Sequence, residues 1–241
     1  MYLFYSIDIP TDVQVGQHLT LDEEQSAHAV RVLRYTVGDT LYVADGRGTL
    51  LTTRVVNPHP KHCEVEVLNI EPQPKHHKGN VHIAVAPTKN IDRMEWCVEK
   101  CTEIGVDTIT PLLCHYSERK QIRNDRLEKI ILSAAKQSLS AYLPQLREMQ
   151  SFSDCVLSAT EQRRYIAHSS PWTDKRDLRD ELRKNPDAES TIVLIGAEGG
   201  FDDDEVRLAM EHGFIPVSLG DARLRTETAA IVACTYISAY V

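Results

Sequence analysis

The stretch Leu194-Ile-Gly-Ala-Glu-Gly-Gly-Phe201 follows an apolar run at residues 191–195 and precedes the pattern Asp202-x-x-Glu205. The apolar run predicts a buried strand, and the pattern after the turn is a capping box, which predicts the start of a helix. The glycines between them let the backbone approach a ligand closely and leave N–H groups available at a helix N-terminus. A tight turn without a ligand is the alternative. The turn is neither a P-loop nor a G-x-G-x-x-G motif, so a Rossmann dinucleotide site is not predicted.

A second polar loop, Ser218-Leu-Gly-Asp-Ala-Arg-Leu-Arg-Thr-Glu-Thr228, leads from a predicted strand at residues 216–219 into a final helix that begins near Thr226. Charged and hydroxyl side chains concentrate at the start of this helix, namely Arg223, Arg225, Glu227 and Thr228. The alternative is that Thr226 only caps the helix and Glu227 only favours its dipole. Loops at consecutive strand ends should lie side by side, where α/β proteins bind ligands. The sequence therefore predicts a pocket formed by the two loops.

Strands and helices alternate through residues 80–241. An apolar run at residues 81–86 predicts a strand covered on both faces, and another strand is predicted at residues 164–167. Apolar residues at helical spacing predict three helices, the first of which ends at Gly105. These residues are Met94, Cys97, Val98, Cys101 and Ile104, then Leu127, Ile130, Ile131, Ala134 and Ala135, and finally Ala230, Ala233, Cys234 and Ile237. The alternation predicts an α/β domain with a mostly parallel sheet.

Residues 1–72 are rich in short segments of branched and aromatic side chains, which predict a small β-barrel-like domain. The predicted strands are residues 2–7, 40–44, 50–56 and 63–68. One helix is predicted at residues 22–33, and Asp45-Gly-Arg-Gly48 is interpreted as a hairpin turn. Residues 73–79 are predicted to be the linker to the second domain, residues 80–241, because the stretch 71–79 holds two prolines and no apolar residue. His76 and His77 in it are expected to be solvated.

The composition is that of a soluble globular protein: 241 residues, 42% hydrophobic and 26% charged. No apolar run approaches the roughly 20 residues of a membrane span, and the first residues lack the features of a signal peptide. The six cysteines are scattered without a C-x-x-C pair, so we expect reduced thiols, a cytoplasmic protein and no metal site.

The net charge of −8 argues against non-specific binding of a polyanion. Residues 1–72 carry 5 basic against 10 acidic side chains, and residues 73–241 carry 22 against 25. A local basic stripe interrupts this acidic balance, with Arg119, Lys120, Arg123, Arg126, Lys129 and Lys136 beside only Asp125 and Glu128. Selective contact with a nucleic acid and an ordinary solvated helix face are the two interpretations.

Taken together, the motifs resemble the bacterial 16S ribosomal RNA uridine-N3 methyltransferases, members of the SPOUT class. The resemblance rests in the first domain on His28-Ala-Val-Arg-Val-Leu-Arg34, Gly38-Asp39 and Asp45-Gly46, and in the second on Lys89, Asp92-Arg-Met94, Lys100-Cys-Thr-Glu-Ile-Gly-Val106, Pro111-Leu112, Gln137-Ser138, Ile195-Gly-Ala-Glu-Gly-Gly200 and Leu224-Arg-Thr-Glu-Thr-Ala-Ala230. It runs nearly end to end, and its last two motifs are highly specific as a pair. The chain departs from the family pattern at Ala197, Ala222 and Ser140, where proline, a basic residue and arginine are usual.

The resemblance implies a SPOUT-type parallel sheet with a C-terminal trefoil knot, preceded by a PUA-like RNA-binding β-barrel. It implies S-adenosylmethionine in a cleft where the two knotted loops cross, and a homodimer that acts on 16S rRNA or the small ribosomal subunit, away from membranes. The implied cofactor-binding residues are Leu194, Ile195, Gly196, Glu198, Gly199, Gly200, Leu219, Gly220, Leu224, Arg225, Thr226 and Thr228. The implied RNA-binding residues are His28, Arg31, Arg34, Lys89, Arg93, Arg119, Lys120, Arg123, Arg126 and Lys136.

The implied reaction is methylation of uridine N3, which carries a proton and is a poor nucleophile until that proton is lost. Arg225 is expected to stabilise the resulting anion, and Glu198 or Glu227 to accept the proton. The alternative for either carboxylate is a bond to the cofactor or to the backbone. Two other functions compete with this one. The protein could be a non-catalytic RNA-binding assembly factor, or an enzyme of the same fold that acts on another RNA.

Overall fold

The computed structural model describes residues 2–6, 8–171 and 173–240, which divide into two compact units. The N-terminal unit comprises Met1–Lys75 together with Ala135–Leu143, and the C-terminal unit comprises His76–Ala134 and Pro144–Val241. Among the described residues, no helix has both the length and the apolar character that crossing a bilayer requires.

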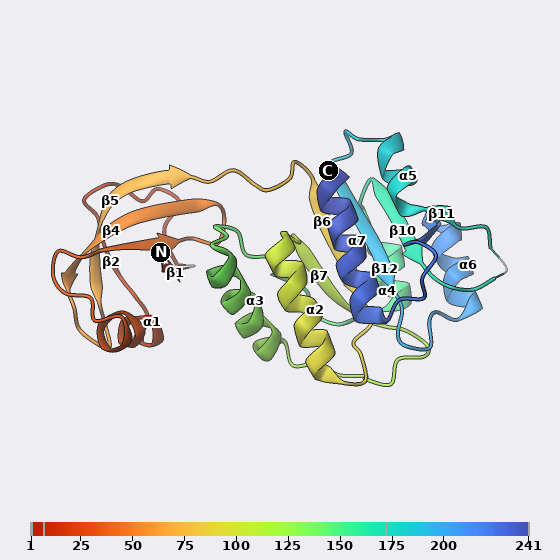
Figure 1. Ribbon diagram of the computed structural model, residues 1–241, viewed down its shortest axis with the longest axis horizontal. Coiled ribbons are helices and arrows are strands. Elements are labelled where there is room, and N and C mark those ends of the chain that lie inside the picture. The colour runs from red at the N-terminus through yellow and green to blue at the C-terminus, as the bar shows by residue number, and fades with distance from the viewer. Residues whose placement is uncertain (1, 7, 172, 241) are drawn as a thin grey trace. The chain divides into compact units, whose positions relative to one another are not determined.

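The N-terminal unit is built on a five-stranded, curled sheet with the strand order β1-β3-β4-β5-β2 (Figure 1). The strands are β1 (Leu3–Tyr5), β2 (His18–Thr20), β3 (Thr40–Ala44), β4 (Thr49–Asn57) and β5 (Glu64–Pro72). Strand β1 pairs in parallel with β3, and all the other pairs are antiparallel. Alternate residues of β3 and β4, such as Leu41, Val43 and Leu51, are fully buried in the core. The predicted strand at residues 2–7 extends to Ile7, which lies outside the described residues.

The predicted helix at residues 22–33 is two short elements rather than one. Helix α1 (Glu23–Ala27) begins at Asp22, whose side chain accepts a hydrogen bond from the backbone N of Gln25 at 2.7 Å. A π-helical turn, η1 (His28–Val32), follows and closes with a bond from Leu33 N to His28 O at 3.0 Å. The widened turn buries Ala29 and leaves Arg31 exposed.

The hairpin predicted at Asp45-Gly-Arg-Gly48 is confirmed, because β3 and β4 pair on either side of it. The Asp45 carboxylate accepts hydrogen bonds from the backbone N of Arg47 and of Thr49, both at 2.8 Å. A side chain at Gly48 would place its Cβ 2.3 Å from the ring of Tyr142, so the hairpin packs against a segment almost a hundred residues later in the chain.

That later segment, residues 139–143, is part of the N-terminal unit, which the sequence did not predict. Gly48 N donates to Ala141 O at 3.0 Å, and Leu143 N donates to Gly46 O at 2.9 Å. The Tyr5 hydroxyl donates to Ser140 O, and the Tyr142 hydroxyl donates to Gln73 O at 3.0 Å. Ser140, one of the departures from the family pattern, thus anchors this return of the chain.

The C-terminal unit is built on a sheet in which every pair of neighbouring strands is parallel, as predicted. Its order is β11-β13-β10-β12-β6-β7-β8, with β9 also paired to β7. The strands are β6 (Asn80–Val85), β7 (Thr108–Leu113), β8 (Gln145–Leu146), β9 (Gln150–Ser151), β10 (Arg163–Ala167), β11 (Arg176–Asp177), β12 (Ser190–Ile195) and β13 (Ile215–Ser218).

Helices cover both faces of this sheet (Figure 1). The helices are α2 (Ile91–Ile104), α4 (Phe152–Ser158), α5 (Leu178–Lys184), α6 (Asp203–Glu211) and α7 (Thr226–Tyr240). Helix α3 (Asn124–Ser138) begins in this unit, and its residues from Ala135 onward belong to the N-terminal unit. Helix α7 packs on α2, β6 and β12. Residues of α4 and α6 share a second core cluster with side chains of β6, β10 and β12.

The predicted ends of three helices are confirmed. Gly105 ends α2 with a φ of 103°, and its N–H bonds to Cys101 O and Thr102 O. Helix α6 begins with both arms of the capping box formed by Asp202 and Glu205. Helix α7 begins at Thr226 and buries the four apolar residues predicted for it.

The prediction of a solvated His77 is wrong, whereas His76 is exposed. The side chain of His77 is 2% exposed, and its ring nitrogens lie 2.8 Å from Gly79 O and 2.7 Å from Gly105 O. The carbonyls of a helix end and of the chain before β6 therefore hold the second of the two histidines in place. A local pattern of polar residues does not reveal such a long-range contact.

Candidate functional site

The glycine-rich turn (residues 196–200) and the second loop (residues 219–225) meet, as the sequence predicts, although their strands are not neighbours in the sheet. Strand β10 lies between β12, which leads into the turn, and β13, which leads into the loop. The second loop ends at Thr226, whose hydroxyl donates to Gly196 O at 3.0 Å in a buried position. The two loops are therefore joined across the carboxyl end of β10.

The glycine-rich turn is tight for reasons of packing. Its ends close through a bond from Gly200 N to Ala197 O at 2.8 Å, so the turn forms with alanine where the family usually has proline. A Cβ at Gly196 would lie 2.9 Å from the backbone of Gly200, and a Cβ at Gly199 would lie 2.9 Å from Tyr116 Cβ. Packing alone therefore requires glycine at two of the three positions.

Open space adjoins each loop at one further glycine. Gly200 has a φ of 82° and Gly220 a φ of 120°, which favour glycine. A Cβ built at either residue would meet no atom within 4 Å. Leu219 and Leu224 of the second loop are half-buried, whereas Leu194 and Ile195 are buried in the sheet. The second loop thus offers apolar side chains beside free space.

A third segment, the 86–90 loop after β6, contacts the glycine-rich turn through Glu198. The Glu198 carboxylate accepts a hydrogen bond from Lys89 N at 2.9 Å. The Arg119 guanidinium donates to Thr88 O at 3.1 Å and to Lys89 O at 2.8 Å. The Lys89 ammonium pairs with Glu118 at 2.8 Å, and this hydrogen bond raises the pKa of Lys89.

These contacts border a cleft of about 420 Å³, lined by Lys89, Glu118, Arg119, Lys120 and Gln121. The sequence singled out three of these residues as basic, but not Glu118. Nor did it single out Tyr116, which packs on Gly199 and whose hydroxyl donates to Asp202 at 3.3 Å. Both residues lie in an irregular segment after β7, and no motif marks them.

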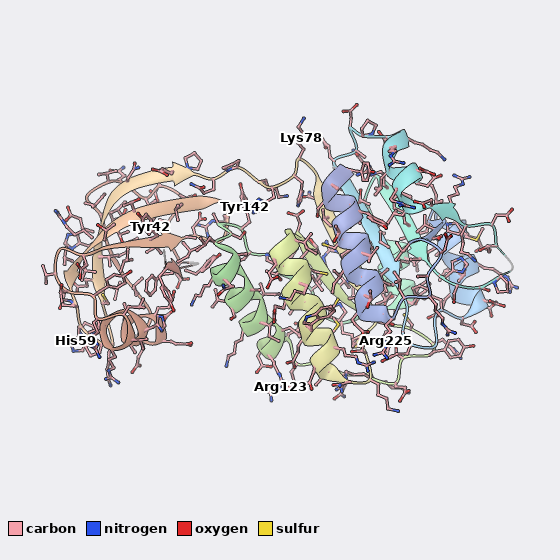
Figure 2. All side chains as sticks on the ribbon, in the orientation of Figure 1. Tyr42, His59, Lys78, Arg123, Tyr142 and Arg225 are labelled. Carbon is pink, nitrogen blue, oxygen red and sulfur yellow. The ribbon has the colours of Figure 1, made fainter. Side chains whose placement is uncertain are left out.

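The charged residues at the start of α7 lie in contrasting surroundings. Arg225 is exposed (Figure 2), and it forms no ion pair within the described part of the chain. Glu227 is only 6% exposed. Its Oε1 lies 3.8 Å from Arg93 Nε, and its Oε2 has no hydrogen-bond partner among the described residues. Glu198 is exposed, so the two candidate proton acceptors differ in burial as well as in partners.

The residues predicted to bind RNA fall on separate parts of the fold. His28 lies in the N-terminal unit, 5.2 Å from the ring of Tyr2, and Arg31 and Arg34 are exposed there. Lys136, at the end of the stripe, lies on α3 with Arg126 and Lys129, and burial lowers its pKa.

Two arginines of the stripe are engaged within the C-terminal unit. Arg123 pairs with Asp125 at 2.7 Å, and Arg126 donates to Glu95 at 2.8 Å. Lys120 remains exposed beside the cleft.

The family model of the RNA methyltransferase domain matches residues 75–238, and that of the RNA methyltransferase PUA domain matches residues 21–68. The chain belongs to the RNA methyltransferase family. The PUA match lies within the N-terminal unit, so this RNA methyltransferase has the predicted combination of a PUA-like β domain and a parallel α/β domain. The trefoil knot stays a prediction.

Known proteins similar to this RNA methyltransferase confirm the resemblance to small-subunit ribosomal RNA methyltransferases. A probable rRNA methyltransferase from Porphyromonas gingivalis is 37% identical, with a TM-score of 0.88 over 100% of this chain and 98% of that one. A ribosomal RNA small subunit methyltransferase E from Neisseria gonorrhoeae, solved with S-adenosyl methionine bound, is 25% identical, with a TM-score of 0.83 over 99% and 97%. A protein of the same name from Buchnera aphidicola is 28% identical over 95% of this chain and 90% of its own.

Proposed function

We propose that this protein transfers a methyl group from S-adenosylmethionine to N3 of a uridine in 16S ribosomal RNA. The observation that carries the proposal is the junction of the glycine-rich turn and the second loop at the Thr226–Gly196 hydrogen bond. It brings together the two motifs by which the chain resembles uridine-N3 methyltransferases. The bound S-adenosyl methionine and the name of the Neisseria relative support the cofactor and the ribosomal substrate.

The residues present fit a nucleoside cofactor held at the two loops. Space lies open beside Gly200 and Gly220, and Leu219 and Leu224 supply half-buried apolar surface next to it. Such surroundings, mostly apolar with a few polar groups, are typical of small-molecule sites. We infer that backbone groups of the two loops, with Arg225 and Thr228 at their edge, hold the cofactor. Thr226 contributes through its bond to Gly196 rather than directly.

S-adenosylmethionine, when bound, supplies an electrophilic methyl group. The protein's own task is to align uridine N3 with that methyl and to remove the N3 proton. Alignment alone is worth several kcal/mol of the barrier. We expect Arg225, which is exposed, to stabilise negative charge on the uracil carbonyl oxygens. Glu227 Oε2, buried without a partner among the described residues, is the candidate acceptor of the N3 proton.

Binding of the RNA is assigned to two surfaces, each within one unit. Arg31 and Arg34 offer exposed cations around the π-helical turn of the N-terminal unit. Lys89 and Lys120 offer ammonium groups in the cleft of the C-terminal unit. Because a uridine must leave its stack to reach an enzyme site, a folded rRNA region is a better substrate than a duplex.

A homodimer is part of the proposal, because α7 is apolar on nearly all sides. Beyond the buried Ala230, Ala233, Cys234 and Ile237, it carries Ile231 and Val232, which are only half-buried within one chain. A second copy packed on this side of α7 would cover them. Analytical ultracentrifugation tests this part, and a monomer at micromolar concentration would contradict it.

The main test maps modified uridines by mass spectrometry in ribosomal RNA from cells with and without the protein. We expect one N3-methyluridine of 16S rRNA to disappear, and an unchanged map would refute the proposed activity. Calorimetric titration with S-adenosylmethionine separates an enzyme from a binding factor, because absence of heat at high concentration would favour a non-catalytic assembly factor. For the role of Arg225, the variant Arg225→Ala should lose most turnover while Arg223→Ala, a neighbouring exposed arginine, serves as the control.

A further inference from the structure

The 86–90 loop is fixed from two sides, although it has no regular secondary structure. From one side the Glu198 carboxylate accepts the hydrogen bond of Lys89 N at 2.9 Å. From the other side Arg119 binds the carbonyls of Thr88 and Lys89. Within the loop, the Thr88 hydroxyl donates to Asn90 O at 2.6 Å. A carboxylate, a guanidinium and a hydroxyl therefore hold five residues in one conformation.

The loop and the glycine-rich turn leave the sheet next to each other. Strands β6 and β12 are paired in parallel, with Val85 opposite Ile195 at their ends. The pairing continues one residue further, since Ala86 N donates to Ile195 O at 2.9 Å. Glu198 lies three residues beyond that point and reaches back to the chain of the neighbouring strand. Among the residues that the structure describes, this is the one hydrogen bond to a side chain that joins the two segments beyond their last paired residues.

We propose that Glu198 is a positioning residue, whose carboxylate holds the 86–90 loop against the glycine-rich turn through Lys89 N. The proposal rests on the proposed function for its catalytic meaning, and it assigns to Glu198 a task other than removal of the N3 proton. One of its oxygens is already occupied by a backbone donor, and the residue is exposed to solvent. Glu227, by contrast, has a buried oxygen without a partner among the described residues.

Fixing the loop also fixes the first turn of α2. Asn90, the residue after Lys89, is the N-cap of this helix, and its side chain accepts a bond from Asp92 N at 3.0 Å. Arg93 lies one residue further and faces Glu227 Oε1 at 3.8 Å. A continuous path of bonded residues therefore leads from Glu198 to the buried carboxylate of α7. Loss of the Lys89 bond would leave only the contacts of Arg119 and Thr88 to hold the loop that precedes Arg93.

Two substitutions separate positioning from proton transfer. Glu198→Gln keeps an oxygen that accepts from Lys89 N but removes the basic carboxylate, whereas Glu198→Ala removes both. Glutamine should restore the activity if Glu198 is a positioning residue, and should not restore it if Glu198 is a general base. Glu211→Ala, an exposed carboxylate at the end of α6, is the matched control for loss of one negative charge.

The first measurement is hydrogen exchange of the Lys89 amide in the full chain without RNA. We expect E198A to exchange about tenfold faster at Lys89, in line with loss of a hydrogen bond to a charged group, and E198Q and E211A to stay close to the unchanged chain. Equal protection in E198A would overturn the proposal. This readout does not depend on methylation, so it stands or falls separately from the proposed function.

The second measurement is the rate of rRNA methylation as a function of pH. We expect E198A to lose roughly 10- to 100-fold in kcat, because small misplacements in an aligned site have effects of this size. E198Q should regain most of that loss and keep the same pH profile. If E198Q is as slow as E198A while its Lys89 amide stays protected, Glu198 acts in proton transfer and the proposal is wrong. If the protein without substitutions methylates no rRNA, the proposed function fails. The exchange result alone then decides whether Glu198 holds the 86–90 loop.

Discussion

Replacing Thr226 by valine removes the hydroxyl that joins the two loops and leaves the shape of the side chain almost unchanged. Thr226 is 6% exposed, and its Oγ1 lies 3.0 Å from the carbonyl oxygen of Gly196, which is itself buried. A buried carbonyl that loses a hydrogen-bond donor costs about 1–3 kcal/mol of the free energy of unfolding. In a unit of this size each kcal/mol lowers Tm by roughly 2–4 °C. We therefore expect calorimetry of Thr226→Val to show a Tm several degrees lower, and titration to show weaker binding of S-adenosylmethionine.

Thr226→Ser is the matched control, since it retains the hydroxyl and loses only a methyl group. It should restore most of the Tm and of the cofactor affinity. If valine is tolerated as well as serine, the hydroxyl does not join the loops and the argument for a pocket at their junction is refuted. If Tm falls but cofactor affinity does not, the junction stabilises the fold without shaping the site.

Three further predictions concern stability. Burial and, to a smaller extent, the charge of Lys175 lower the pKa of His168 from 6.5 to about 4. The stability that its neutral ring contributes is therefore present above pH 6.5 and is lost as the pH falls toward 4. The loss reaches up to about 3 kcal/mol, and thermal melts of His168→Gln should show a shallower pH dependence. Leu139 is 46% exposed and has a φ of 56°, a backbone conformation that favours glycine. Leu139→Gly should therefore raise the free energy of unfolding by about 1 kcal/mol. A lower free energy of unfolding in a urea titration would contradict this prediction. Gly48→Ala should destabilise the N-terminal unit by roughly 2 kcal/mol or more in the same assay, because its Cβ would meet the Tyr142 ring at 2.3 Å, and an unchanged midpoint would contradict that packing.

The elements that the sequence predicts well are those with local causes. The apolar run that forms β12, the capping box of α6 and the C-terminal glycine of α2 each depend on neighbouring residues only. Strand β7 was not predicted. Pro111 lies within it, and proline argues against a central strand. In the structure Pro111 is paired with Val85 in the parallel sheet.

The candidate site could be predicted in its motifs but not in its contacts. The two loops stand out by their glycines and charges, yet nothing local indicates that Glu198 binds Lys89 N or that Tyr116 packs on Gly199. The basic stripe was open to two interpretations, and its sequence did not reveal that Arg126 binds Glu95 of another helix. Such long-range partners depend on the topology of the sheet, which periodicity does not encode.

The return of residues 139–143 to the N-terminal unit has a consequence for biosynthesis. The hairpin at Gly46 and Gly48 lacks two of its backbone partners, Ala141 O and Leu143 N, until Leu143 has been translated. The smaller unit thus cannot complete its hydrogen bonding when its last strand, β5, leaves the ribosome. It can do so only after β6, α2, β7 and α3 of the intervening chain have been translated. A fragment that ends at residue 75 would lack these two hydrogen bonds permanently. The backbone of Gly46 and Gly48 would then be exposed to water, where residues 139–143 cover it in the full chain.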